Sequence, residues 1–308
     1  MNTKCNVIID SCCDLPKETI DREGVYLLKF PYIDSKGTHI DDMFQSVSPE
    51  EFYDGMRNGE EPSTAQIPMA DITEAYQWAY EQGKPAVFIC FSSGLSGTYD
   101  TCVLLRDQFV AEHPDFELHV VDSKLASIAE GFLVHGALSE REKGLSAKEL
   151  AAWVEEAQYF INCSFMIDDL EVLRRGGRIP SSVAFAGSKL DLKPLLTFGL
   201  EGTLSLMGMA RGRKKGMKQM IEHYEKTRMQ SVNSSRIIVA HADAKKDLDK
   251  LIELIEKSDE DALILESVVG PVIGSHVGPG MVAMVFWGSD RRDSGSLADR
   301  IANKVKGK

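Results

Sequence analysis

Several features that would place this protein in a membrane or outside the cell are missing from its sequence. No stretch of the 308 residues approaches the roughly 20 consecutive apolar residues that a helix needs to span a bilayer. The polar start and the short apolar run 7–9 do not resemble a secretory leader. We therefore expect a cytoplasmic protein, with at most a transient contact with a membrane surface.

The chain also has fewer basic than acidic residues, and its His and Cys residues lack the paired spacings that are typical of metal sites. Lys and Arg number 35 against 47 Asp and Glu, and the net charge of -12 argues against nucleic-acid binding. The seven histidines form no His-x-His or His-x-x-x-His pair, and the six cysteines form no Cys-x-x-Cys pair. We expect free thiols, no metal and no cofactor.

What the sequence does contain is a globular balance of 43% hydrophobic and 27% charged residues. In the first half, predicted strands alternate with predicted helices. The strands are 7–10, 25–32, 86–91 and 118–122. The main helices are 49–58, 69–83, one that starts at about Ser96 and carries its apolar face as far as Phe109, 128–143 and 147–158. A further helix is expected to open at Asp14, with Asp14 as its cap and Pro16 in its first turn. This alternation predicts an N-terminal α/β domain, residues 1–159, with a doubly wound parallel sheet.

The second half has a different pattern, in which hairpins are mixed with helices. Strands are predicted at 161–167, 193–198, 203–209, 237–242, 263–267 and 281–287, and helices at 169–175, 214–229 and 246–257. We predict a C-terminal α+β domain, residues 160–288, with a mixed, largely antiparallel sheet. Residues 289–308 are expected to be a polar tail.

The stretch 89–99, Ile-Cys-Phe-Ser-Ser-Gly-Leu-Ser-Gly-Thr-Tyr, joins a buried strand to a helix. Ser96 stands where a helix N-cap would stand, and Gly94 and Gly97 would let a ligand approach the backbone. Free N–H groups and hydroxyls at such a turn, including that of Ser93, suit an anion. The same residues also suit a cap without a ligand. The turn has neither the Gly-x-Ser-x-Gly of lipases nor the Lys of a P-loop.

Three polar pairs follow predicted parallel strands at their carboxyl ends. They are residues 10–11, 92–93 and 122–123, which read Asp-Ser, Ser-Ser and Asp-Ser. Parallel sheets bind ligands beyond this edge, so the three pairs predict a polar site there.

Six motifs in order then resemble a known family. They are Asp-Ser-x-x-Asp-Leu-Pro (10–16), Thr-x-Gln (64–66), Leu-Ser-Gly-Thr-Tyr (95–99), Asp-Ser (122–123), Leu-Glu-x-Leu-Arg-Arg-Gly-Gly-Arg (170–178) and Gly-x-His-Val-Gly-Pro-Gly (274–280). The chain resembles the DegV family of bacterial fatty-acid-binding proteins over residues 7–287. Any one of these motifs alone would mean little, but the six in this order are highly specific for the family.

The resemblance implies that one fatty acid, similar to palmitate, stearate or oleate, is buried between two domains. The family's carboxylate-binding Thr and Ser map to Thr64 and Ser96. Its nearby His, in the Gly-x-His-x-Gly-Pro-Gly loop, maps to His276. Ser93, Gly94 and Gly97 would complete the site loop. Ala65 stands where the family usually has Ser, and Cys12 and Cys13 replace small or hydroxylated residues, so the preferred acyl chain stays open.

The resemblance also implies a protein partner. Some members present the bound acid to a separate fatty acid kinase subunit, which makes acyl phosphate for phospholipid synthesis. Arg178 and Arg211, in two basic segments of an acidic chain, are the candidates for docking that kinase.

A competing hypothesis is a serine hydrolase or esterase. Ser96 would be its nucleophile and His276 its base, with Asp122 as a candidate for the intervening acid. Against this hypothesis, the nucleophile motif is broken and no glycine run for an oxyanion hole is evident.

Overall fold

The computed structural model describes residues 3–179, 191–229 and 236–294. Its N-terminal half is built on a four-stranded sheet in the order β2-β1-β6-β7, with parallel neighbours throughout. The strands are β1 (Asn6–Asp10), β2 (Val25–Leu28), β6 (Ala86–Cys90) and β7 (Leu118–Asp122). The two central strands, β1 and β6, are buried along their whole length. Nearly continuous apolar runs of this kind are typical of parallel strands covered on both faces.

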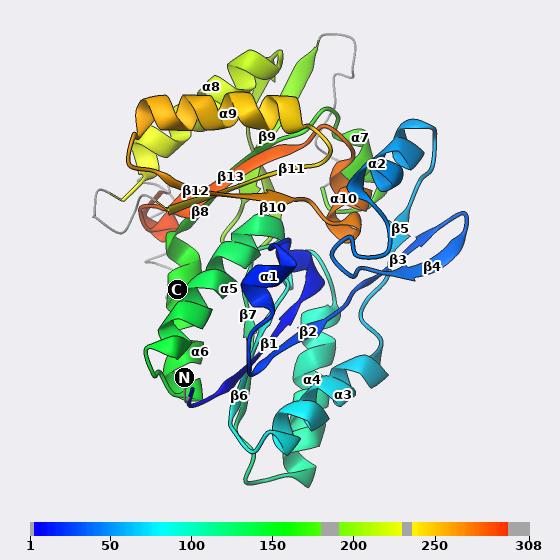
Figure 1. Cartoon of the computed structure of the whole chain (residues 1–308), viewed down its shortest axis with the longest axis vertical. Coiled ribbons are helices and arrows are strands. Elements are labelled where there is room, and N and C mark those ends of the chain that lie inside the picture. The colour runs from blue at the N-terminus through cyan, green and yellow to red at the C-terminus, as the bar shows by residue number, and fades with distance from the viewer. Residues whose placement is uncertain (1–2, 180–190, 230–235, 295–308) are drawn as a thin grey trace, which may run out of the picture.

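Helices cover the two faces of this sheet, as the alternating pattern predicted (Figure 1). On one side, α3 packs on β2 and α4 packs on β7, and on the other side α6 packs on β6 and β7 and carries α5. The helices are α3 (Met69–Glu81), α4 (Thr98–Glu112), α5 (Ser127–Glu142) and α6 (Ala147–Ala157). Ser146 begins α6 with a complete capping box.

The second half contains a six-stranded sheet in the order β10-β9-β8-β13-β11-β12. Its strands are β8 (Ile161–Met166), β9 (Leu192–Phe198), β10 (Leu204–Arg211), β11 (Arg236–His241), β12 (Leu263–Val268) and β13 (Val282–Trp287). The β11–β12 pair is parallel and the other described pairs are antiparallel. This confirms the predicted mixed, largely antiparallel sheet and its hairpin.

Alternate residues of this sheet belong to two different cores. Phe165, Ala283 and Ile238 face the N-terminal half and share its core, whereas their neighbours Met166 and Met284 belong to a separate outer core. Two helices, α8 (Arg213–Thr227) and α9 (Lys245–Ser258), lie over the outer face (Figure 1). On the inner face, α5 packs across β8, β13 and β11. The period of two residues per strand therefore divides the sheet into an inner and an outer face.

The predicted strand 25–32 is wrong, because it is two strands in two sheets. The first, β2, ends at Leu28. The second, β3 (Pro31–Asp34), forms a small antiparallel sheet with β4 (Gly37–Ile40) and β5 (Ser63–Thr64). Proline has no N–H to donate to a ladder, and Pro31 stands at the first residue of the new strand β3, where this loss is tolerated.

Asp14 is not the helix cap that its sequence context predicted. It follows a short 3-10 helix, η1 (Ser11–Cys13), in the left-handed conformation (φ 47°), and is buried. Helix α1 (Lys17–Ile20) begins after Pro16. The Asp14 carboxylate instead accepts hydrogen bonds from Ser127 Oγ (2.5 Å) and from the backbone N–H of Gly270 (2.9 Å). Asp14 therefore binds residues far away in the sequence instead of capping the helix that follows it.

Shorter helices complete the chain. They are α2 (Pro49–Arg57), α7 (Glu171–Arg175) and α10 (Pro271–Val277), with 3-10 turns η2 (Gln158–Phe160) and η4 (Arg291–Ser294). Ser48 caps α2, because its Oγ accepts a hydrogen bond from the N–H of Glu51. The expected polar tail extends beyond η4, where residues 295–308 lie outside the described part.

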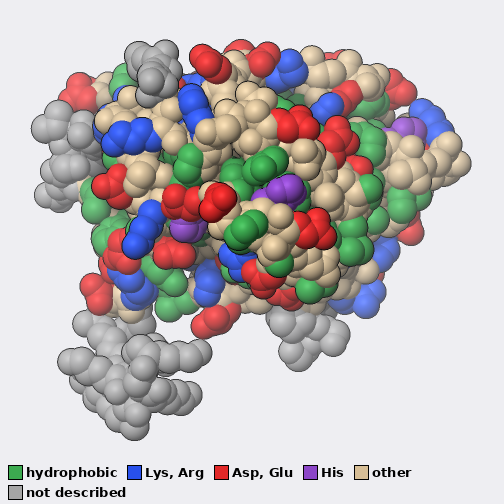
Figure 2. Space-filling model, turned by 90° about the horizontal axis from the view of Figure 1, so that it is seen from below, with side chains coloured by type: hydrophobic (Ala, Val, Ile, Leu, Met, Phe, Trp, Pro, Cys, Tyr) green, Lys and Arg blue, Asp and Glu red, His purple; other side chains and the backbone are tan. Residues whose placement is uncertain are grey.

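Acidic and basic side chains are interspersed on the face seen in Figure 2. In the described ranges, none of the helices is both long and apolar enough to cross a membrane. The six cysteines are all buried and unpaired.

Candidate functional site

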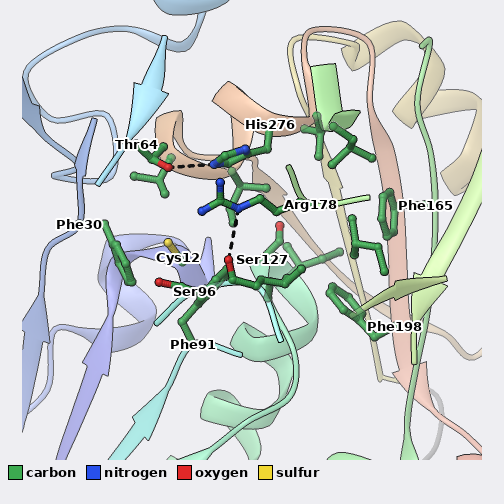
Figure 3. A pocket seen from close by; sticks show the side chains of 18 of the residues that line it. Cys12, Phe30, Thr64, Phe91, Ser96, Ser127, Phe165, Arg178, Phe198 and His276 are labelled. Carbon is green, nitrogen blue, oxygen red and sulfur yellow. Dashed lines mark hydrogen bonds between the residues drawn. The ribbon is translucent and has the colours of Figure 1, made fainter. Parts of the chain in front are cut away.

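A cavity of about 500 Å³ lies between the inner face of the six-stranded sheet and the loops at the carboxyl ends of the parallel sheet (Figure 3). Most of its lining side chains are apolar, and they come from both halves. Hydroxyl, imidazole and guanidinium groups of Thr64, Ser93, Ser96, His276 and Arg178 also line it. A cavity of this size with a few polar groups is typical of a small-molecule site.

A hydrogen bond joins Thr64 and His276 in the wall of this cavity. Thr64 Oγ1 lies 2.9 Å from His276 Nε2, which connects β5 of the first half with α10 of the second (Figure 3). The sequence placed His276 in a loop, but it lies in the last turn of α10. Pro271 at the first helical position and Gly278 after the last turn are the local signals that this helix offered.

His276 is neutral in this environment. Burial, together with the nearby positive charge of Arg178, lowers the pKa of His276 to about 4. Its Nδ1 atom is buried without a hydrogen-bond partner among the described residues, and the ring packs against Gly176, where any Cβ would collide with Nδ1. A ring that donates from Nε2 to Thr64 would leave the Thr64 hydroxyl hydrogen free to point at a ligand.

Ser96 also reaches the cavity, from the turn between β6 and α4. Its Oγ lies 3.0 Å from Thr98 Oγ1 and accepts a hydrogen bond from the Thr98 N–H at 3.2 Å. The N-cap position of α4 is Gly97, one residue after the predicted cap. Ser96 therefore stabilises the start of the helix and still exposes a hydroxyl to the cavity.

The other residues assigned to the site loop have protein neighbours. Ser93 lines the cavity, but its Oγ donates to Asp122 at 2.5 Å. A Cβ on Gly94 would lie 2.6 Å from the carbonyl oxygen of Glu201, in the β9–β10 turn, and one on Gly97 would collide with the amide of Gln66. These glycines therefore allow close approach of protein, with Gly97 also lining the cavity.

The polar pairs at the carboxyl ends of the strands lie at the predicted edge, and several of their side chains hold loop backbone in place. Asp10 accepts from the N–H groups of Phe91 (2.8 Å) and Cys12 (3.1 Å), and burial raises the pKa of Asp10 to about 7. Both of these backbone groups belong to residues that line the cavity. The pairs thus mainly position the site, and of their side chains only that of Ser93 also lines the cavity.

Arg178, a docking candidate in the sequence, lies in the cavity wall next to His276 (Figure 3). Its guanidinium donates to the carbonyl oxygens of Leu95 (3.2 Å) and Gly176. Burial lowers the pKa of Arg178, but an arginine stays protonated in proteins. It therefore brings a positive charge to the polar end of the cavity. Arg211 is exposed at the end of β10 and is not among the lining residues.

Sequence reasoning assigned no site role to Gln66 or Ser127, which also line the cavity. Gln66 belongs to the Thr-x-Gln motif, and this was the available signal. Ser127 has a positive φ of 53° and donates its hydroxyl hydrogen to Asp14. No local pattern in the sequence indicates that conformation.

The geometry does not assemble the hydrolase of the competing hypothesis. His276 Nε2 pairs with Thr64, Ser96 Oγ pairs with Thr98, and Asp122 accepts from Ser93 and from the N–H of Lys124. A nucleophile, its base and the orienting acid need successive hydrogen bonds to one another. In the described ranges, no group of three or more His, Cys, Asp or Glu side chains forms a metal site.

Comparisons with known proteins identify the family of this chain. Residues 4–288 match the family model described as "Uncharacterised protein, DegV family". A DegV domain-containing protein of Clostridium perfringens is 35% identical over 286 residues, which cover 92% of this chain and 98% of that protein. The chain therefore belongs to the DegV family.

Solved structures share the fold. A DegV family protein from Thermus thermophilus, described by its fatty acid binding, aligns with a TM-score of 0.81 and 28% identity over 92% of this chain and 99% of its own. The Fatty Acid Kinase (Fak) B3 protein of Streptococcus pneumoniae, loaded with linoleic acid, aligns with a TM-score of 0.80 and 21% identity over 92% and 99%. The predicted two-domain α/β fold is confirmed.

Proposed function

We propose that this protein binds one long-chain fatty acid, similar to palmitate, stearate or oleate, in the cavity between its two halves. The observation that carries the proposal is the cavity itself. It is apolar over most of its lining and has Thr64, Ser96 and His276 gathered with Arg178 at one place. The DegV family protein from Thermus thermophilus is described by its fatty acid binding, which supports a fatty acid as the ligand here.

Burial of the acyl chain provides most of the binding free energy. Each buried methylene contributes about 0.8 kcal/mol, so a dozen or more contribute roughly 10 kcal/mol before ordering costs. The carboxylate must keep hydrogen bonds when it leaves water. Thr64 and Ser96 offer hydroxyl hydrogens, and His276 orients Thr64 through their 2.9 Å contact. Arg178 adds a positive charge that keeps the acid ionised.

The test of this function is the content of the purified protein. Protein isolated gently from a bacterial host is expected to release close to one fatty acid per chain on organic extraction, measured by mass spectrometry. Delipidated protein should take up added palmitate or oleate. Extracts without acyl chains, together with no uptake of either acid, would overturn the proposal.

We further propose that the protein is a carrier and that a separate kinase subunit phosphorylates the bound acid, making acyl phosphate for phospholipid synthesis. Two observations support a carrier. First, the residues of the hypothetical hydrolase have other hydrogen-bond partners. Second, a protein with a similar fold is the Fatty Acid Kinase (Fak) B3 protein of Streptococcus pneumoniae. A serine-reactive phosphonate should therefore leave Ser96 unlabelled, and covalent labelling of Ser96 would favour the hydrolase.

The position of Arg211 makes it the better docking candidate of the two arginines. It is exposed, whereas Arg178 lines the cavity. In a reconstituted kinase assay, Arg211→Ala should lower acyl-phosphate formation without changing fatty-acid affinity, and the exposed Lys226→Ala on α8 is the control. Arg178→Ala should lower both properties. Equal behaviour of Arg211→Ala and the control would remove Arg211 from the docking surface.

A further inference from the structure

One row of side chains crosses the inner face of the six-stranded sheet and contains two alanines. The register pairs Leu196 with Phe165, Phe165 with Ala283, and Ala283 with Ala240. All four side chains are buried in the inner core. Ala283 and Phe165 line the cavity, but Ala240 does not. The cavity therefore reaches the first alanine of the row and ends before the second.

The beginning of α5 forms the wall opposite this row. Ala126 and Ile128 line the cavity, and α5 packs across β8, β13 and β11, the three strands that carry Phe165, Ala283 and Ala240. The space over Ala283 is thus a channel between a helix and a sheet. Its lining there is apolar, so a hydrocarbon fits it and a charged group does not.

The cavity has two sides, and the side lined by Ala283 and Phe165 suits the acyl chain better. Figure 3 shows Phe165 and Phe198 on one side of the polar groups, and Phe30 with Cys12 on the other. On the second side, the rings of Phe30 and Phe91 are in edge contact, with centroids 5.7 Å apart. Both rings line the cavity and fill space on the second side, whereas the small side chain of Ala283 leaves room on the first side.

We propose that the acyl chain runs over the inner face of the sheet and that Ala283 determines how long a chain fits. This inference rests on the proposed fatty-acid function and names the residue that sets its specificity. The backbone at Ala283 has little freedom to move away from a larger side chain. Its neighbours Val282 and Met284 are fully buried in the outer core under α8 and α9. A side chain added at position 283 must therefore extend into the channel.

The experiment compares acids of increasing length on delipidated full-length protein. Affinities for laurate, myristate, palmitate and stearate are measured by displacement of a fluorescent fatty acid. In Ala283→Leu, the affinity for stearate should fall about tenfold or more, while that for laurate stays within about threefold of wild type. Met284→Leu is the matched control, because it changes the next residue of β13 on the opposite face. It should keep the wild-type order of affinities.

Two further variants keep the inference testable if Ala283→Leu does not fold. Phe165→Leu enlarges the same end of the cavity and should raise the affinity for arachidate relative to palmitate severalfold. Cys12→Leu fills the other side and should leave the length dependence unchanged. If Cys12→Leu discriminates against stearate, or if Ala283→Leu and Phe165→Leu bind every acid in the wild-type order, the inference is overturned. Wild-type protein that binds none of the acids would instead overturn the fatty-acid function on which it rests.

Discussion

The two faces of the six-stranded sheet are made by alternate residues of the same strands, yet they differ in what they do. The outer face packs under α8 and α9, where Met284 and Phe286 are fully buried and Tyr224 meets the ring of Phe286 edge-on at 4.8 Å. The inner face borders a cavity of about 500 Å³. One face is thus filled by protein, while the other leaves room for a ligand. We expect substitutions on the outer face to affect mainly stability, and substitutions around the cavity to affect mainly binding.

The largest effect should come from emptying the filled face. Phe286→Ala is expected to lower the free energy of unfolding by about 3–5 kcal/mol, because it leaves a void in a close-packed core. Phe165→Ala should cost clearly less, since that side chain already borders the cavity. Urea denaturation of both delipidated variants measures the difference. Equal losses would show that the inner face is as tightly packed as the outer one.

The second effect concerns pH and the buried carboxyl group of Asp41. Burial raises the pKa of Asp41 from 3.8 to about 7, and its carboxylate lies close to Gly270 at the start of α10. Between these pH values the folded protein holds a proton that the unfolded chain has released. The stability is therefore full below about pH 4 and is lost as the pH rises through 7, by up to about 4 kcal/mol for this group.

Unfolding free energies measured from pH 5 to pH 8 should show this loss, and Asp41→Asn should reduce it. His276 acts in the opposite direction, because its pKa is lowered from 6.5 to about 4 and its contribution is lost as the pH falls through that range. An unchanged pH profile in Asp41→Asn would show that Asp41 is already ionised in the folded protein.

The contact between the two halves should respond next. Gly94→Ala places a Cβ 2.6 Å from the backbone of Glu201, so the β9–β10 turn has to shift. We expect a loss of about 1–3 kcal/mol in stability and a weaker affinity for fatty acid, since Phe198 and Leu204 on either side of that turn line the cavity. Gly55→Ala is the matched control, because its Cβ would meet only ordinary contacts. The same thermal denaturation midpoint in both variants would contradict the prediction.

The smallest effect is expected at the polar end of the cavity, and it should appear chiefly in binding. Thr64→Val and Ser96→Ala should each weaken fatty-acid binding by about 1–2 kcal/mol, because each would remove one of the hydrogen bonds that we propose for the buried carboxylate. Thr64→Val keeps the shape of the side chain but also removes the 2.9 Å hydrogen bond to His276, so the delipidated variant should lose about 1 kcal/mol of unfolding free energy as well. Wild-type affinity in both variants would place the carboxylate elsewhere.

The sequence alone was enough to predict most elements, because their signals are local. Apolar periodicity located the parallel strands and their covering helices, and the side chains of Ser48 and Ser146 cap two of the predicted helices, α2 and α6. Six ordered motifs were also sufficient for the family. The predicted domain limits, 1–159 and 160–288, and the head-group roles of Thr64, Ser96 and His276 remain predictions.

Other features depended on contacts between distant residues, and only the tertiary structure decided them. Asp14 became a buried acceptor because Gly270, far along the chain, offers its N–H. Arg178 entered the cavity wall because the chain after α7 places it against Leu95. The row of side chains that contains Ala283 and Ala240 is formed only by the strand register, which pairs residues from separate strands. Periodicity shows which residues share a face of a strand, but the strand pairing decides which of them are neighbours, and the size of the cavity follows from those neighbours.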